Sequence, residues 1–168
     1  MEIINMRSLV VGRFQPLHIG HLKMLEYAAS KSKYLVIGLG SCNKSGTWDN
    51  PFTAEEREEM IKESLEVETP YDIKRIPDFD DDGRWIQWIR ENLGFDVFMT
   101  NSIHERRIFE GAGVKVLDIP FFNRNIYSAT EVRKRILEDR DWAALLPVGT
   151  VKVLTRINGR DRIKKLKN

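Results

Sequence analysis

The sequence predicts an α/β fold, in which five parallel strands form a Rossmann-like, doubly wound sheet and further helices follow at the C-terminal end. Five short and mostly apolar runs recur along the chain, and stretches with helical periodicity separate them. Strands that alternate with helices pair in parallel, because a right-handed crossover returns the chain to the same edge of the sheet. The predicted strands are residues 8–12, 34–40, 71–76, 95–100 and 114–119.

Length and charge favour one domain without a bulk electrostatic partner. A chain of 168 residues suits a single domain, and a domain of this size buries roughly 70% of its unfolded surface. We expect a Rossmann-like core over about residues 1–145 and a helical extension over about residues 146–168. Because the chain has 27 Lys and Arg and 25 Asp and Glu, the net charge is only +2, and we predict no nucleic-acid or membrane partner.

Composition also predicts a soluble, cytoplasmic protein. Cys42 is the single cysteine, so the sequence offers no internal disulfide and fits a reducing compartment. The segment from Met1 to Met6 is too short and too polar for a signal peptide. No apolar run approaches the length that spans a membrane.

A strand, a tight loop and a helix open the chain. A buried apolar run ends at Gly12, and a loop with Pro16 leads to a helix that opens near Ile19. Apolar residues then return at helical spacing, at Leu22, Leu25 and Ala29.

Two imidazoles three residues apart, His18 and His21, can share one face of that first helical turn. Free N–H groups at a helix start favour an anion, so the spacing predicts a bound phosphate, and Gly20 would let a nucleotide lie close to the backbone. The alternative is that His18 caps the helix and His21 is an ordinary surface residue. Zinc is disfavoured, because no Cys or carboxylate nearby completes a ligand set.

The ten residues from Gly12 to His21 resemble the G-x-F-x-P-x-H-x-G-H segment of nucleotidyltransferases with the HIGH-type motif. They look most like the archaeal nicotinamide-nucleotide adenylyltransferase branch of that superfamily. The resemblance favours the phosphate interpretation and implies ATP as the ligand. The residues that it assigns to ATP in this segment are Gly12, Arg13, Phe14, His18, Gly20 and His21.

A second motif starts the next predicted helix. After the polar loop 41–50, Thr53 and Glu56 have the spacing of a capping box. With Asn50 in front, this segment resembles the N-P-F-T-A-G-E-R motif of archaeal members, and Glu55 stands where glycine is usual.

Two residues are candidates for binding the acceptor. Trp85 and its apolar neighbours have a helical spacing that mostly indicates core, and the family resemblance makes Trp85 a candidate to stack on a nicotinamide ring. Asn101 leaves the carboxyl end of a predicted strand, the edge where open parallel sheets bind ligands. The acidic run 78–83 fits a magnesium site or, more simply, a solvated turn or helix cap.

A second phosphate site is predicted at residues 127–136. Ser128 and Glu131 have capping-box spacing, yet a cap does not explain Arg133 and the two cations after it. Hydroxyls at the positive helix end, together with Arg133, can hold a polyphosphate; a solvated basic face is the alternative. The segment is similar to the family's I-S-S/G-T-x-x-R motif. Ser128, Thr130 and Arg133 match it, whereas Tyr127 and Ala129 depart from it.

Two further basic stretches have no predicted ligand. Arg106 and Arg107, on a predicted helix over 103–110, fit a solvent face or a partner contact.

Short helices are expected at 141–146 and at 148–158, where Gly159 breaks the second. The basic end is typical of a solvated helix face and leaves an RNA or acidic-partner role open. It comprises Arg160, Arg162, Lys164, Lys165 and Lys167.

Two separate phosphate motifs, without a recognisable nucleophile, base or triad, predict direct transfer of AMP from ATP to a phosphorylated acceptor. The resemblance implies nicotinamide mononucleotide (NMN) as acceptor, NAD and pyrophosphate as products, and a homo-oligomer. His18 and His21 would stabilise the α-phosphoryl oxygens and the bridge that breaks, while Arg133 would hold the β- and γ-phosphates. Mg²⁺, held mainly by phosphates rather than by direct protein ligands, would join them.

One departure leaves other functions open. Ser45-Gly46-Thr47 replaces the S-H-T of archaeal relatives, and the missing imidazole admits other phosphorylated acceptors, including nicotinate mononucleotide, FMN and phosphopantetheine, by adenylyl or cytidylyl transfer. A non-catalytic nucleotide-binding sensor is a further alternative. A class I aminoacyl-tRNA synthetase is disfavoured, because the chain has no K-M-S-K-S loop and lacks the length for an anticodon domain.

Overall fold

The computed structural model describes residues 4–167 and divides into two compact units, each assembled from separate stretches of chain. The sheet unit contains residues 4–12, 24–41 and 66–121, and the helical unit contains residues 13–23, 42–65 and 122–167. Helix α1 (Ile19–Lys31) begins in the helical unit and ends in the sheet unit. Both predicted phosphate motifs, apart from Gly12, therefore belong to the helical unit.

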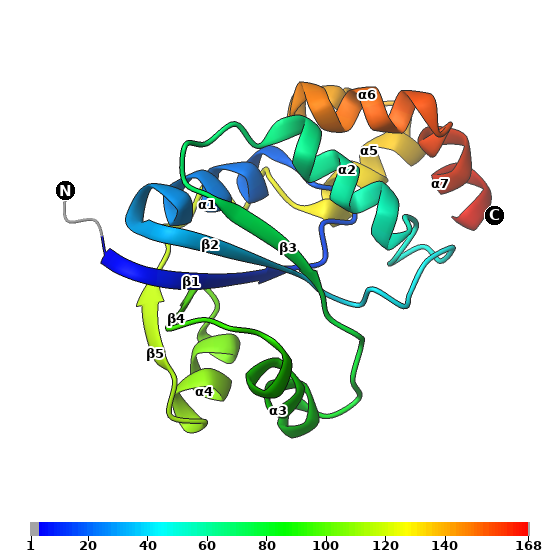
Figure 1. Ribbon diagram of the computed structural model, residues 1–168. Helices are drawn as coiled ribbons and strands as arrows, with labels where there is room; N and C mark the ends of the chain where they lie inside the picture. The colour runs from blue at the N-terminus through cyan, green and yellow to red at the C-terminus, as the bar shows by residue number, and fades with distance from the viewer. Residues whose placement is uncertain (1–3, 168) are drawn as a thin grey trace. The chain divides into compact units, whose positions relative to one another are not determined.

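Five parallel strands form the sheet, in the order β3-β2-β1-β4-β5 (Figure 1). The chain runs outward from β1 through β2 to β3 and then crosses to the other side of β1 for β4 and β5. The sheet is therefore doubly wound, with its switch point between β1 and β4, and the predicted fold class is confirmed. The strands are β1 (Ile4–Gly12), β2 (Ser32–Leu39), β3 (Tyr71–Arg75), β4 (Val97–Thr100) and β5 (Lys115–Asp118).

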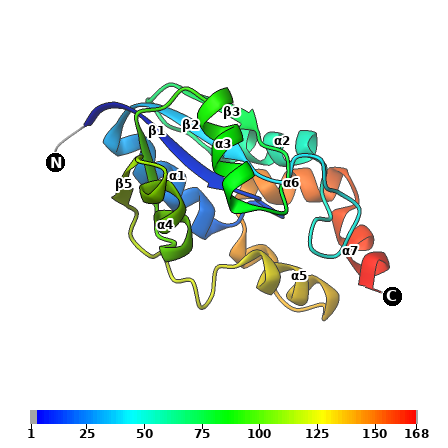
Figure 2. The same ribbon diagram turned by 90° about the horizontal axis from the view of Figure 1, so that it is seen from below.

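Helices α3 (Asp82–Asn92) and α4 (Ile103–Gly111) lie side by side on one face of this sheet (Figure 1, Figure 2). Phe109 of α4 stacks on Phe98 of β4, with ring centroids 3.5 Å apart and planes 8° apart. Trp85 of α3 meets Phe109 edge to face at 5.6 Å. Aromatic side chains thus join both helices to the strands, and for α3 the apolar spacing predicts this packing.

Polar residues before these helices fix where each begins. Asp81 accepts two backbone N–H groups from the first turn of α3, so the acidic run 78–83 includes a helix cap, as one of its two interpretations predicts. Ser102 caps α4 by accepting one backbone N–H, that of Glu105. On α4, Arg106 pairs with Asp118 of β5, which ties one member of the predicted basic pair to the sheet.

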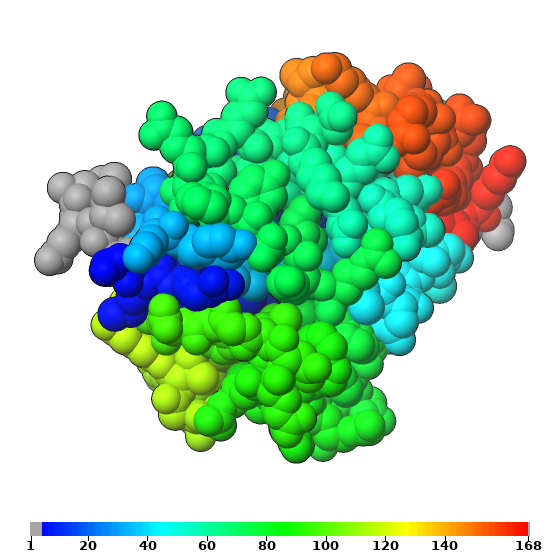
Figure 3. Space-filling view, viewed as in Figure 1, coloured from blue at the N-terminus to red at the C-terminus, as the bar shows by residue number. Residues whose placement is uncertain are grey.

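The helical unit contains four complete helices besides the start of α1. Helix α6 packs closely on α2, because Gly149 lies against the backbone carbonyl of Glu63, where a side chain would not fit. Helix α7 contacts α5 and α6, and the orange and red surfaces of the last two helices adjoin in Figure 3. These helices are α2 (Ala54–Ser64), α5 (Ala129–Leu137), α6 (Val148–Arg156) and α7 (Gly159–Lys167).

Two helices differ in extent from the prediction. Residues 141–146 give only one 3₁₀ turn, Ala143–Leu145. Helix α6 ends at Arg156, and Gly159 begins α7 instead of only ending a helix. None of the helices described among residues 4–167 is long and apolar enough to cross a membrane.

The basic end of the chain is largely paired within the helical unit. Arg162 forms two hydrogen bonds with the carboxylate of Glu56, at 2.6 and 2.9 Å. Arg160 and Lys164 both reach Asp139, at 3.4 and 2.6 Å. Three of the five cations therefore bind carboxylates of their own chain, while Arg160, Lys165 and Lys167 are exposed, as a solvated basic face predicts.

Truncation of the buried ring in the sheet unit should destabilise the protein strongly. Phe109→Ala removes a fully buried side chain that stacks on Phe98, and we expect a loss of about 3–5 kcal/mol in the free energy of unfolding, measured by urea denaturation. Ile103→Ala on the same helix is the control, because this side chain is 69% exposed; its cost should stay within about 0.5 kcal/mol. Equal costs for the two variants would contradict this packing.

Candidate active site

His18 and His21 hold each other at the start of α1. The Nδ1 atom of His18 accepts the backbone N–H of His21 at 3.2 Å, and Nδ1 of His21 accepts the backbone N–H of His18 at 3.3 Å. The rings stack with centroids 3.6 Å apart. This reciprocal arrangement is a capping box built from imidazoles. The two backbone N–H groups that the sequence predicts as donors to an anion therefore donate to the imidazole rings instead.

These hydrogen bonds determine which ring nitrogen carries the proton. A neutral imidazole whose Nδ1 accepts a hydrogen bond carries its proton on Nε2. Burial lowers the pKa of His18 from 6.5 to about 4. Burial, with a smaller contribution from His18, lowers the pKa of His21 well below 6.5. At neutral pH each ring is therefore an uncharged donor with one Nε2–H to offer.

Arg133 of α5 lies against the loop that leads to these imidazoles. Its Nη1 donates to the backbone carbonyl of Gln15 at 2.9 Å. The residue is only 4% exposed, and its Nε is buried without a hydrogen-bond partner among the described residues. Its Nη2 lies 3.7 Å from Oδ1 of Asp49. Burial lowers the pKa of Arg133, Asp49 opposes that shift and Arg13 adds to it. A buried cation with an unpaired donor favours an anionic ligand.

Two buried side chains that sequence reasoning missed hold loop 13–18 in place. The amide of Gln15 donates to the backbone carbonyl of Phe52 at 3.0 Å and accepts its N–H at 2.9 Å. Arg57 is fully buried and donates from Nη1 to the backbone carbonyl of Arg13 at 2.8 Å. The only signal in the sequence was the resemblance of the segment that contains Arg57 to a family motif.

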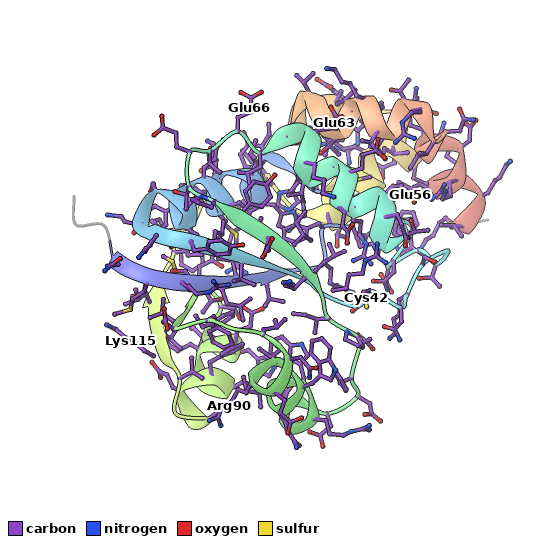
Figure 4. The ribbon with its side chains drawn as sticks, viewed as in Figure 1. Cys42, Glu56, Glu63, Glu66, Arg90 and Lys115 are labelled. Carbon is purple, nitrogen blue, oxygen red and sulfur yellow. The ribbon has the colours of Figure 1, made fainter. Side chains whose placement is uncertain are left out.

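The start of α2 supports this loop through its own cap. Thr53 and Glu56 exchange hydrogen bonds at 3.2 and 2.9 Å, which confirms the predicted capping box. Glu56, labelled in Figure 4, also binds Arg162 of α7. Burial raises the pKa of Glu56, but hydrogen bonds from Arg162 and Thr53 outweigh it, and the net pKa is lowered. Helix α7 thus braces the segment on which Gln15 is anchored.

Gly20 and Phe14 pack around the imidazoles. A Cβ atom at Gly20 would lie 2.9 Å from Cβ of Tyr127 and 3.0 Å from ring atoms of His18. A side chain at position 20 would therefore crowd Tyr127 and His18, and the close approach of a nucleotide to Gly20 stays a prediction. Phe14, which is buried and has a φ of 52°, meets the ring of His21 edge-on at 4.9 Å.

The second motif is only partly assembled as predicted. Ser128 caps α5 by accepting the N–H of Glu131 at 3.1 Å. The carboxylate of Glu131 pairs with Arg135 at 3.0 Å, so the predicted capping box is half formed. Thr130 is exposed. Within this motif, the direct contact with loop 13–18 comes from Arg133.

Gly12, Trp85 and Asn101 lie in the sheet unit. The carbonyl of Gly12 accepts the N–H of Gly40 at 2.8 Å, which joins the ends of β1 and β2. Trp85 is half-buried on Phe109, as described above. Asn101 follows β4 and lines a cavity of about 440 Å³ with the mainly apolar residues after β5. Within residues 4–167, no three His, Cys, Asp or Glu side chains are grouped to hold a metal ion.

Acid should destabilise the protein through His18. Its pKa is about 4 in the folded chain and about 6.5 when unfolded, so the unfolded state binds more protons between these values and stability falls as the pH falls from 6.5 to 4. His18→Asn keeps an acceptor for the N–H of His21 and removes this titration. Between pH 6.5 and 4, the unfolding free energy of the wild type should fall by about 3 kcal/mol more than that of the variant. Parallel pH curves would contradict the shift.

The chain is similar to known proteins over nearly its whole length. Residues 9–135 match the family model described as cytidylyltransferase-like. A protein of Methanococcus aeolicus named nicotinamide-nucleotide adenylyltransferase is 38% identical over 163 residues, which cover 96% of this chain and 95% of the relative. A protein of the same name from Thermococcus sibiricus is 39% identical over 166 residues, covering 96% and 89%.

Solved structures show the same fold. A bifunctional NMN adenylyltransferase/ADP ribose pyrophosphatase from Francisella tularensis, crystallised with AMP and a manganese ion, superposes with a TM-score of 0.80 at 23% identity. The match covers 97% of this chain and 52% of that one, so the chain spans about half the length of the bifunctional protein. The family model and the archaeal relatives show the family: the chain belongs to the cytidylyltransferase-like family and, within it, to the nicotinamide-nucleotide adenylyltransferases.

Proposed function

We propose that this chain transfers the adenylyl group of ATP to NMN, forming NAD and releasing pyrophosphate. The observation that carries the proposal is the pair of neutral Nε2–H donors on His18 and His21, held by the same loop that Arg133 contacts. The names of the archaeal relatives support NMN as the acceptor.

The proposed chemistry is a direct displacement at the α-phosphorus of ATP. An oxygen of the acceptor phosphate attacks this phosphorus, a new P–O–P bond forms, and the bond to the β-phosphate bridge breaks so that pyrophosphate leaves. His18 and His21 donate their Nε2–H groups to the α-phosphoryl oxygens and the breaking bridge, where negative charge grows. Because neither ring needs to take up a proton, the donors are preorganised at neutral pH.

Arg133 supplies the positive charge for the β- and γ-phosphates in this proposal. Its buried Nε, without a partner among the described residues, and its long contact with Asp49 leave donors for phosphate oxygens. Arg13, whose side chain is exposed and whose charge lowers the pKa of Arg133, adds a second cation near the same place. Ser128 and Thr130 are the remaining candidate ATP residues of the second motif.

We further propose that ATP enters as its magnesium complex, in which phosphate oxygens hold the ion. Magnesium then arrives with the substrate. We place the enzyme in the cytoplasm as a homo-oligomer, on the basis of its single cysteine and of its resemblance to the archaeal family.

Removal of either imidazole should abolish most of the turnover. His18→Ala and His21→Ala are each expected to lower kcat about a hundredfold or more, because each loses one donor to the developing charge. The assay follows pyrophosphate release and identifies the dinucleotide product by mass. His104→Ala is the matched control, since the side chain of this third histidine is 72% exposed on α4. Near-normal turnover in both single variants would contradict the proposed roles.

The acceptor can be tested by substitution and by a panel of substrates. Trp85→Ala should raise the KM for NMN roughly tenfold, as expected for a lost aromatic stack, and leave the KM for ATP unchanged. Trp85→Phe should restore most of the affinity, and Trp88→Ala on the same helix is the control.

In the same assay, NMN is replaced in turn by nicotinate mononucleotide, FMN and phosphopantetheine. We expect the highest kcat/KM with NMN. A higher value with another acceptor would overturn NMN as the substrate, and pyrophosphate release with none of them would indicate a sensor.

A further inference from the structure

A short turn in the helical unit places two residues against Arg133. Residues 47–50 form this turn, which we call the tip turn. The N–H of Thr47 donates to the carbonyl of Asn50 at 3.3 Å, and the N–H of Asn50 donates to Oγ1 of Thr47 at 3.1 Å. Trp48 and Asp49 occupy its centre. Because both ends are tied to each other, the two central side chains project from a closed loop.

Two cations lie close to the ring of Trp48. The guanidinium carbon of Arg133 is 5.6 Å from the centroid of its ring, and Nζ of Lys167 is 4.7 Å from it. In Figure 3 the cyan surface that includes residues 42–50 adjoins the red surface of α7. Such contacts attract cations to the face of an indole. They hold the tip turn beside Arg133, with Asp49 next in the chain.

Asp49 is the carboxylate that the turn brings to Arg133. Its Oδ1 lies 3.7 Å from Nη2, beyond ordinary hydrogen-bond length. The Asp49 side chain is 74% exposed, whereas that of Arg133 is 5% exposed. An ion pair of this kind with one partner in solvent contributes little to stability, so a stronger anion can replace it. Within residues 4–167 the buried Nε of Arg133 has no hydrogen-bond partner, so Asp49 leaves this donor unused.

We propose that Asp49 is a specificity-determining residue that competes with the β- and γ-phosphates of the substrate for Arg133. The inference rests on the proposed function, in which Arg133 holds those phosphates and the imidazoles hold the α-phosphate. Asp49 pairs with Arg133 in the free protein and is displaced by a ligand that carries a pyrophosphate group. Its negative charge also repels that ligand. Asp49 therefore weakens binding both by occupying Arg133 and by repelling the phosphate charge.

The proposal makes a distinction between ligands. A ligand that reaches Arg133, such as pyrophosphate, must displace Asp49. AMP carries only the phosphate assigned to His18 and His21, so it leaves the pair in place. Removal of the carboxylate charge should therefore tighten binding of the first class and not of the second.

The experiment compares Asp49→Asn with the wild type by calorimetric titration of the full-length chain with pyrophosphate and, separately, with AMP. We expect pyrophosphate to bind roughly two- to fivefold more tightly to the variant, and AMP to bind equally to both. Asp161→Asn is the matched control, because it removes the same charge from an exposed position on α7. It should change neither affinity.

A second comparison tests whether the effect passes through Arg133. In an Arg133→Gln background, Asp49→Asn should no longer change the affinity for pyrophosphate, and Arg133→Lys provides a second background if the first does not fold. The proposal would be overturned if Asp49→Asn left the affinity for pyrophosphate unchanged or made binding undetectable. It would also be overturned if Asp49→Asn raised the affinity for AMP equally, or if Asp161→Asn raised the affinity for pyrophosphate as much. These titrations need no turnover, so a failure of the proposed function, seen as no NAD formed by the wild type, is distinguished from a failure of this inference.

Discussion

The reciprocal hydrogen bonds between His18 and His21 are the constraint on which the candidate site depends. Each ring satisfies a backbone N–H at the start of α1, so the same two bonds that cap the helix also fix the tautomer of both imidazoles. Burial keeps both rings uncharged at neutral pH. Helix capping uses Nδ1 of His18 and leaves its Nε2 for the proposed contact with phosphate, so the two interpretations that the sequence presents for His18 are compatible.

Buried polar side chains hold the loop before these imidazoles rigid. Gln15 exchanges two hydrogen bonds with the backbone of Phe52, and Arg57 and Arg133 each donate to a loop carbonyl. In a buried setting such bonds are costly to break, because the freed groups would have no water to bind. Arg133 differs from Arg57 in that its buried Nε has no hydrogen-bond partner in the part of the chain that the structure describes, whereas Nε of Arg57 donates to the carbonyl of Thr53. This difference favours Arg133 as the candidate ligand residue.

The sequence predicts the fold well because its signals are local. Apolar runs that end in glycine or proline, and a capping box at Thr53 and Glu56, act over a few residues and appear in the structure where the pattern places them. What it could not predict depends on residues far apart in the chain. The side chain of Gln15 meets Phe52 across 37 positions, and Arg133 meets Gln15 across 118. Gly20 illustrates the limit: the sequence shows a glycine between the two imidazoles, but it does not show that Tyr127 packs against it.

The central claim, that both imidazoles are neutral Nε2–H donors fixed through Nδ1, can be tested by a proton–nitrogen correlation spectrum of the histidine rings. The exposed ring of His104 serves as an internal reference. At pH 7 we expect two rings with an unprotonated Nδ1 and a protonated Nε2, which stay neutral when the pH is lowered to about 5. Addition of AMP should shift their Nε2 resonances. A proton on Nδ1 of either ring, or titration of either near its ordinary pKa of about 6.5, would contradict the account.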